Sequence, residues 1–217
     1  MAPPLPPKIS TPRLTLLRLT HTTPLTHPHV RLFHENWSDP TATAWSLHGA
    51  THSLAESQAW MTEQFTGSDN IFYAVFARTE QQQQQEEEEE DATVDAKTYD
   101  AELGLHIGSD GNETNQDINL RVLGYALFPS SWGKGYATES NRALIAAYGA
   151  AVASTSTTTT TKKFYIEAAV DDDNPGSIHV LRKLGFRRIG WKDEGGDKVW
   201  LNGAWRGPGY WVYGLFV

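Results

Sequence analysis

The chain has 217 residues, a length that suits one well-packed α/β domain, because two domains would each be small. Its formal net charge is −8, but the acidic run at residues 86–91 supplies six of these negative charges, so the remainder is nearly balanced. Lys and Arg are not clustered, and we therefore expect no nucleic-acid surface. The absence of cysteine excludes disulfides, thiolate metal sites and cysteine nucleophiles.

Residues 1–8 are expected to form a frayed tail, since four prolines among the first seven residues prevent a helix. This segment has no apolar leader region, and no stretch approaches the roughly 18 apolar residues that a membrane span requires. These features predict a cytoplasmic protein without a membrane partner. They leave open whether it is a monomer or a homodimer.

The first half of the chain shows an alternating strand pattern at 13–20, followed by a helix at 28–37. Ser53-Leu-Ala-Glu56 is a capping-box pattern that begins a second helix, for which Gly67 is a plausible end. A buried strand is predicted at 71–77.

A run of Gln and Glu at about 79–100 has too few apolar residues to pack, so we interpret it as an insert within the domain. The strand pattern resumes at 101–107, and a second low-complexity insert is expected at 153–162. The other predicted elements are strands at 118–128, 164–170, 188–192 and 210–216, and helices at 136–151 and 174–184. Asn202-Gly203 favours a tight reversal between the last two strands.

A glycine-containing turn carries the clearest functional signal. The strand that ends near Phe128 runs through Gly133 and Gly135 directly into a helix. Glycines allow positive φ angles and a close approach to a ligand, and the N-terminus of a helix suits a phosphate. The P-loop pattern is absent, and Thr138 breaks a Rossmann fingerprint. Taken alone, the turn is equally compatible with a structural role.

Two motifs in the same order resemble the GNAT N-acetyltransferases, particularly the RimJ/RimL branch that acetylates ribosomal-protein N-termini. The segment Trp132-Gly-Lys-Gly-Tyr-Ala-Thr-Glu139 resembles the pyrophosphate loop of that family. Asn174-Pro-Gly-Ser177, followed by Leu-Arg-Lys-Leu-Gly-Phe186, resembles its Asn-x-x-Ser and Gly-Phe element. The segment beginning at Thr11-Pro-Arg also resembles the first strand of the branch. The resemblance covers residues 9–217 apart from the two inserts.

The resemblance implies a single α/β (α+β) domain at 9–217, with a mixed central sheet of six to seven strands flanked by helices. Strands at 123–128 and 164–170 would splay apart around acetyl-CoA. The implied activity is acetyl transfer to a primary amine, either a protein N-terminus or a small molecule. Two alternatives remain open: a non-catalytic CoA-binding or interaction protein that retains the fold, and an enzyme that uses another acyl-CoA.

The same resemblance implies which residues bind the cofactor. A backbone N–H near Leu127 or Phe128 would polarise the thioester carbonyl, and Asn174 would bond the pantetheine amides. An Asn at this position, followed by Pro175, is also a typical helix N-cap. The remaining implied contacts lie in the glycine turn: Trp132, Gly133, Lys134, Gly135, Tyr136, Ala137 and Thr138.

Acetyl transfer needs a neutral amine, so a general base must remove its proton. Glu102 and His106 are candidates, although either could be an ordinary strand-surface residue. Many family members have a tyrosine at the position of Leu181, and its replacement leaves Ser177 as the implied proton donor to the CoA thiolate. A plain helix-capping role for Ser177 is the competing interpretation.

The remaining polar and aromatic residues receive weaker expectations. Glu139 is expected to stabilise a helix start, where an acidic group suits the helix dipole. Trp37, Trp45 and the tryptophans at 191–211 could line the acceptor pocket or pack in the core. Four histidines have no evident metal-ligand spacing and are given no role: His21, His27, His29 and His34.

Overall fold

The computed structural model describes the backbone of most of the chain. The described residues are 5–67, 70–78, 101–108, 118–155 and 163–217, with side chains for all of them except 101–108, 118 and 155.

A mixed sheet of eight strands forms the centre of the molecule, rather than the expected six to seven. Neighbouring strands are antiparallel except for β5 and β6, which are parallel. In spatial order the strands are β1 (Lys8–Ser10), β2 (Leu14–Leu19), β3 (Ile71–Ala77), β4 (Ala101–Gly108), β5 (Ile118–Leu127), β6 (Lys163–Val170), β10 (Gly209–Phe216) and β7 (Arg187–Asp193). Two further strands, β8 (Val199–Leu201) and β9 (Ala204–Arg206), form a separate hairpin.

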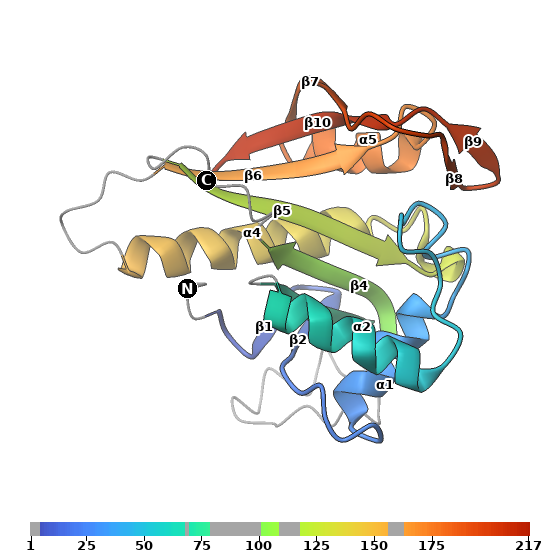
Figure 1. Ribbon diagram of the computed structural model, residues 1–217. Coiled ribbons are helices and arrows are strands. Elements are labelled where there is room, and N and C mark those ends of the chain that lie inside the picture. The colour runs from blue at the N-terminus through green and yellow to red at the C-terminus, as the bar shows by residue number, and fades with distance from the viewer. Residues whose placement is uncertain (1–4, 68–69, 79–100, 109–117, 156–162) are drawn as a thin grey trace.

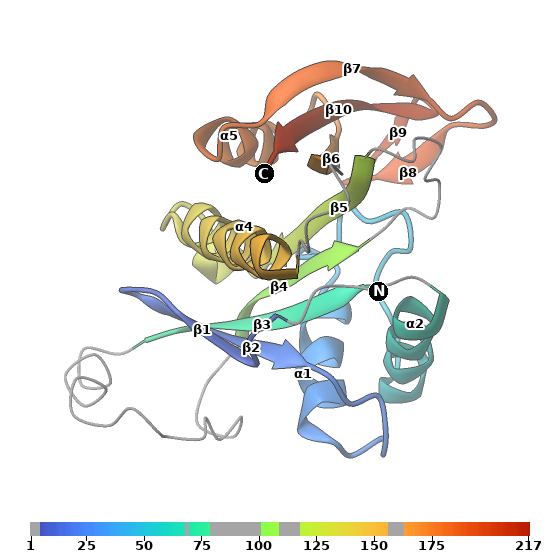
Figure 2. The same cartoon turned by 90° about the vertical axis from the view of Figure 1, so that its left-hand side faces the viewer.

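Four α-helices in the described part of the chain cover the two faces of this sheet (Figures 1 and 2). One face carries α1 (Pro28–Trp37) and α2 (Leu54–Gly67), and the other carries α4 (Tyr136–Thr155) and α5 (Pro175–Lys183). A short 3-10 helix, η2 (Pro129–Ser131), precedes α4. Among the described residues, no helix combines the length and apolar character needed to cross a bilayer.

Strand β3 lies between two apolar cores, which explains why nearly all of it is buried. Alternate side chains of a strand point to opposite faces of the sheet. Ile71, Tyr73 and Val75 accordingly pack in the core beneath α4 and α5. Phe72, Ala74 and Phe76 pack with residues of α1 and α2.

The helix ends follow local sequence signals. At α2, the Glu56 N–H donates to Ser53 Oγ (3.1 Å), and the Glu56 carboxylate accepts from the His52 N–H (2.6 Å). At α5, Asn174 Oδ1 accepts from the Ser177 N–H (3.1 Å), and Gly185 adopts φ +90° just after the helix. These contacts confirm the predicted helix starts and the glycine stop of α5.

The N-terminal segment differs from the expected frayed tail at residues 5–8. Leu5 is only 4% exposed and belongs to the main core. The Tyr73 hydroxyl donates to the Pro6 carbonyl (2.6 Å), and Lys8 begins β1. The prolines prevent a helix, but an extended chain can still pair with β2 and bury one apolar side chain.

Two other boundaries also differ. Helix α4 runs to Thr155, so the insert expected at 153–162 starts later; residues 156–162 and the whole insert at 79–100 lie outside the described residues. Asn202 and Gly203 do form a tight reversal, with φ angles of +46° and +77°. This turn joins β8 to β9, a hairpin that was not expected.

The parallel pair β5 and β6 opens towards its C-terminal end, as Figure 1 shows. Their pairing runs from Ile118 opposite Lys163 to Val122 opposite Glu167. Beyond Val122, β5 continues beside β4 and β6 continues beside β10. The opening lies where the sequence resemblance implies splayed strands.

A cleft at the opening between two strands

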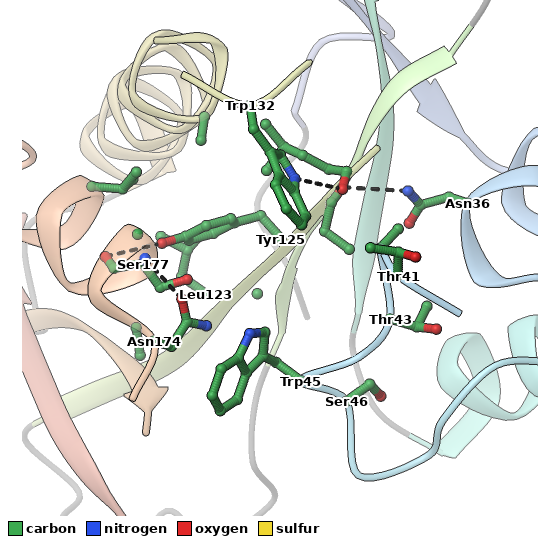
Figure 3. Close-up of a pocket in the computed structure, with 18 of the residues that line it drawn as sticks. Asn36, Thr41, Thr43, Trp45, Ser46, Leu123, Tyr125, Trp132, Asn174 and Ser177 are labelled. Carbon is green, nitrogen blue, oxygen red and sulfur yellow. Dashed lines mark hydrogen bonds between the residues drawn. The ribbon is translucent and has the colours of Figure 1, made fainter. Parts of the chain in front are cut away.

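A cleft of about 660 Å³ lies where β5 and β6 separate (Figure 3). We call the lining residues from β5, the glycine turn and α5 its donor side: Leu123–Leu127, Trp132, Gly133, Ala137, Asn174–Ser177, Val180 and Leu181. We call the lining residues from α1, the following loop and the β8–β9 hairpin its acceptor side: Phe33, Asn36, Trp37, Thr41–Thr43, Trp45, Ser46 and Asn202.

The glycine turn on the donor side requires left-handed backbone angles. Gly133 has φ +74° and Gly135 has φ +83°, a region that is strained for residues with a side chain. A Cβ on Gly133 would meet no atom within 4 Å, so the backbone angle and not crowding explains this glycine. The turn leads directly to Tyr136, the first residue of α4. Free N–H groups at such a helix start suit a pyrophosphate.

Arg13 and Glu139 hold the N-terminal segment against this turn. The Glu139 carboxylate accepts hydrogen bonds from Thr11 Oγ1 (2.6 Å) and Arg13 Nε (2.7 Å). Arg13 Nη1 donates to the Lys134 carbonyl (3.0 Å), and the guanidinium lies 5.2 Å from the centre of the Tyr136 ring. The expected role of Glu139 at the helix start agrees with these contacts.

The contacts of Glu139 also change its acidity. Partial burial alone would raise its pKa, but the hydrogen bonds from Thr11 and Arg13 and the charge of Arg13 outweigh burial and lower it. Arg13 was not predicted to reach the turn. The only sequence signal was its place in the Thr11-Pro-Arg13 segment, which by itself indicates a strand start.

Tyr125 and the first turn of α5 meet across the donor side (Figure 3). The Tyr125 hydroxyl donates to the Ser177 carbonyl oxygen at 3.3 Å. Burial raises the pKa of Tyr125 to about 12, although its hydrogen bond with Ser177 acts in the opposite direction. Leu181, at the position where the family often has tyrosine, is 1% exposed in the core and carries no proton to donate.

Six of the predicted site residues line the cleft: Leu127, Trp132, Gly133, Ala137, Asn174 and Ser177. The Leu127 carbonyl is already engaged, because it accepts from the Trp132 indole N–H (3.0 Å). The other predicted cofactor residues belong to the same turn or flank it but are not among the residues lining the cleft: Phe128, Lys134, Gly135, Tyr136 and Thr138.

The candidate bases Glu102 and His106 lie on β4, beside the donor side of the cleft. In the backbone register His106 pairs with Gly124, a lining residue of β5. The side chains of both candidates fall outside the described residues. Their role therefore stays a prediction.

The tryptophans separate into two groups. Trp37 and Trp45 line the cleft, and Trp37 also packs against the core formed with α1 and α2, so their role in an acceptor pocket stays a prediction. The C-terminal tryptophans are not among the lining residues, and three of them are too exposed to be core: Trp191 (48%), Trp200 (58%) and Trp205 (65%). Trp211 packs against the main core and is partly buried.

Arg206 of β9 joins the acceptor side to the start of α5. Its guanidinium pairs with Asp171 (3.3 Å) and Asp173 and lies 4.7 Å from the centre of the Trp45 ring. Its Nε donates to the Leu201 carbonyl (3.1 Å), within the same hairpin. The Asn202 N–H donates to the Ala44 carbonyl at 2.8 Å. Residues distant in sequence thus hold the loop that carries Trp45 in place.

Three histidines to which the sequence interpretation gave no metal-ligand spacing come together at the start of α1. The rings of His21, His27 and His29 have centres 4.5 to 5.2 Å apart. However, His27 Nδ1 accepts from the His29 N–H (3.1 Å), and His29 Nδ1 accepts from the Thr20 N–H (3.0 Å). In these two rings, when neutral, the proton then lies on Nε2, so that nitrogen is not free to bind a metal. The hydrogen bonds are those of a helix cap and a turn.

The comparisons with known proteins agree with this architecture. A model of the GNAT acetyltransferase domain matches residues 17–187. No curated protein matches the chain. The solved structures similar to it include a spermidine N-acetyltransferase from Vibrio cholerae in complex with CoA and spermine. That structure has a TM-score of 0.63 at 13% identity, over 94% of this chain and 95% of the other.

Two further similar structures are named for ribosomal-protein acetylation or RimJ. The ribosomal-protein-S5-alanine acetyltransferase from Vibrio fischeri has a TM-score of 0.62 at 16% identity, over 96% of both chains. Mycobacterium smegmatis RimJ in complex with CoA-disulfide has a TM-score of 0.58 at 18% identity, over 100% of this chain and 90% of the other. At these identities the structural likeness establishes the fold, and the domain model covers most of the sequence. The chain therefore belongs to the GNAT family of acetyltransferases, in its RimJ/RimL-like part, and this family of acyltransferases uses acetyl-CoA.

Proposed function

We propose that the protein transfers the acetyl group of acetyl-CoA to a primary amine by direct attack of the amine on the thioester. The observation that carries this proposal is the continuity of the cleft. One cavity extends from the glycine turn and α5 to the loop that bears Trp45, so a cofactor and an acceptor can meet inside it.

The donor side has the groups that a CoA molecule requires. Gly133 and Gly135 have the backbone angles of a close-fitting turn, and Lys134 is exposed beside them. Negative phosphates at this position would also lie near the N-terminal end of α4, which favours them electrostatically. Asn174 lies on the cleft and could bond a pantetheine amide through its Nδ2, since its Oδ1 caps α5.

The chemistry needs a neutral amine and a proton for the departing sulfur. Glu102 or His106, on the strand next to β5, is the proposed base that deprotonates the amine. A backbone N–H near Leu127 or Phe128 would polarise the thioester carbonyl. Ser177 is a candidate proton donor, because it lines the cleft one helical turn after Asn174.

The acceptor is proposed to be a protein N-terminus or a small-molecule amine. Both classes occur in the names of similar structures, which include a spermidine and a ribosomal-protein acetyltransferase. Hydroxyl and aromatic side chains predominate on the acceptor side of the described cleft. The alternative is a non-catalytic CoA-binding protein, which would bind the cofactor without turnover.

A two-part experiment tests the proposal. Acetyl-CoA at about 100 times its Kd should stabilise the protein by about 2.7 kcal/mol, measured as a rise in Tm. Turnover with a panel of peptides and small amines should then release CoA thiol, which can be detected without background because the chain has no cysteine. Stabilisation without turnover on any amine would favour the non-catalytic alternative. If acetyl-CoA does not stabilise the protein, both the proposed enzymatic function and the non-catalytic CoA-binding alternative are refuted.

A further inference from the structure

We propose that the Tyr125 hydroxyl is the group that gives its proton to the CoA sulfur when the thioester bond breaks. This inference rests on the proposed function, since it assigns a residue to one step of that reaction. In this proposal Tyr125, and not Ser177, donates the proton, and the Ser177 carbonyl oxygen positions the phenol.

The position of Tyr125 on β5 places its side chain in the cleft. It lies three residues beyond Val122, where the pairing of β5 with β6 ends, and on its other edge it pairs with Leu105 of β4. Its ring reaches across the opening towards α5, and the hydroxyl ends at the first turn of that helix (Figure 3). The phenol therefore lies at the place where the two strands make room for a ligand.

The hydrogen bonds around Ser177 orient this phenol. Asn174 Oδ1 accepts a hydrogen bond from the Ser177 N–H (3.1 Å), and the Ser177 carbonyl oxygen accepts one from the Tyr125 hydroxyl (3.3 Å). A hydroxyl bond to oxygen is usually 2.7–2.8 Å long, so this contact is weak and the proton can be redirected to a nearby sulfur. The first turn of α5 thus holds both Asn174, the residue proposed to bind pantetheine, and Tyr125, the proposed proton donor.

The chemistry of the candidate donors favours a phenol. Tyr125 and Ser177 are the two residues of the donor side that carry a hydroxyl. An aliphatic hydroxyl is a far weaker acid than a phenol, whose ordinary pKa is about 10, and proton transfer is most effective when donor and acceptor are well matched. Burial raises the pKa of Tyr125 to about 12, which keeps the phenol protonated at neutral pH but makes it a weaker acid than an ordinary tyrosine, though still a stronger one than an aliphatic hydroxyl.

The step balances without another reagent. The amine nitrogen forms a bond to the acetyl carbon, and the bond between that carbon and sulfur breaks, leaving a thiolate. The thiolate takes the Tyr125 proton to become the thiol. The resulting phenolate then regains a proton that originated on the attacking nitrogen, delivered by the base or by water. The net products are an amide and CoA with a free thiol.

Kinetics of Tyr→Phe variants give the first test. Tyr125→Phe removes one oxygen and keeps the ring, so we expect kcat to fall by about 100-fold or more, with little change in the Kd of acetyl-CoA. Tyr210→Phe is the matched control, because its hydroxyl donates to Glu194 and the residue is not among those lining the cleft. Ser177→Ala should lose less activity than Tyr125→Phe. A larger loss of activity in Ser177→Ala than in Tyr125→Phe would identify Ser177 as the proton donor and overturn the proposal.

A second test needs no acceptor amine. The rate at which iodoacetamide alkylates protein-bound CoA, followed against pH with protein in excess, reports the pKa of the bound thiol, since the chain has no competing cysteine. A phenol that donates to the sulfur stabilises the thiolate, so Tyr125→Phe should raise that pKa by about one pH unit. An unchanged thiol pKa would overturn the assignment even if the enzyme is active. If CoA does not bind at all, the proposed function fails and the assignment fails with it.

Discussion

The two sides of the cleft are built in different ways. The donor side consists largely of two short stretches of sequence, residues 123–137 and 174–181, and it depends on backbone angles and helix starts. The acceptor side combines α1, the loop around Trp45 and a distant hairpin, held by side-chain contacts of Arg206. The difference teaches that the donor side is positioned mainly by local backbone geometry, whereas the acceptor side depends on contacts between distant parts of the chain.

The largest effect is expected from breaking the contacts of Arg206. The side chains of Arg206 and Asp171 are only 12% and 17% exposed, so Arg206→Met leaves a poorly solvated carboxylate without its cation. We expect a loss of about 2 kcal/mol in the free energy of unfolding, measured by urea denaturation. The KM of the amine should rise, while the Kd of acetyl-CoA should change little.

Arg188→Met is the matched control for Arg206→Met. Arg188 also lies over a tryptophan, at 4.2 Å from the Trp211 ring, but it is exposed and is not among the residues lining the cleft. Its replacement should leave the amine KM unchanged. If Arg206→Met raises the Kd of acetyl-CoA and the KM of the amine by equal factors, the two sides act as one unit and the distinction between them fails.

The next effect concerns the backbone of the glycine turn. Gly135→Ala forces a side chain into φ +83°, at a cost of about 1–2 kcal/mol, and sets a Cβ 3.4 Å from Arg13 Nη2. We expect the affinity for CoA to fall by about tenfold in isothermal titration calorimetry, because 1.4 kcal/mol corresponds to a factor of ten. Gly190→Ala, in open space without a positive φ, should have no such effect. Equal affinities in the two variants would show that the turn does not hold the phosphates.

Asn174 separates a capping role from a role in binding. Asn174→Ala removes the hydrogen bond to the Ser177 N–H and should cost about 1 kcal/mol of stability, together with CoA affinity. Asn174→Ser can still cap the helix, so we expect it to recover the melting temperature but not the affinity. Recovery of both properties would mean that Asn174 acts only as a cap.

The smallest effect is expected at acidic pH, from Glu139. A carboxylate whose pKa is lowered by folding adds stability above its ordinary pKa of 4.5, and this contribution disappears as the pH falls through the lower folded value. The Tm difference between the wild type and Glu139→Gln should therefore be largest near neutral pH and shrink below about 4.5. A difference that does not vary between pH 7 and pH 3 would exclude an ionic role for Glu139 in fixing the turn.

Local sequence patterns were sufficient to predict features that depend on contacts between residues close together in the chain. The start of α2 at Ser53, the cap at Asn174 and the reversal at Asn202 follow from side chains and angles within a few residues. The burial of Leu5 could not be predicted in this way, because it depends on pairing between the N-terminal segment and β2. The contact of His21 with His27 and His29 could not be predicted either, because it depends on how the chain folds back at the start of α1.

The sequence by itself determined the family resemblance, the glycine turn and the helix caps, because glycine angles, helix starts and caps are properties of contiguous residues. The tertiary structure decided the rest. It brought Arg13 to the glycine turn, Arg206 to Trp45, and the Tyr125 hydroxyl to Ser177. These contacts join residues far apart in the chain, and no local pattern specifies them, because they arise only when the sheet and its helices pack together.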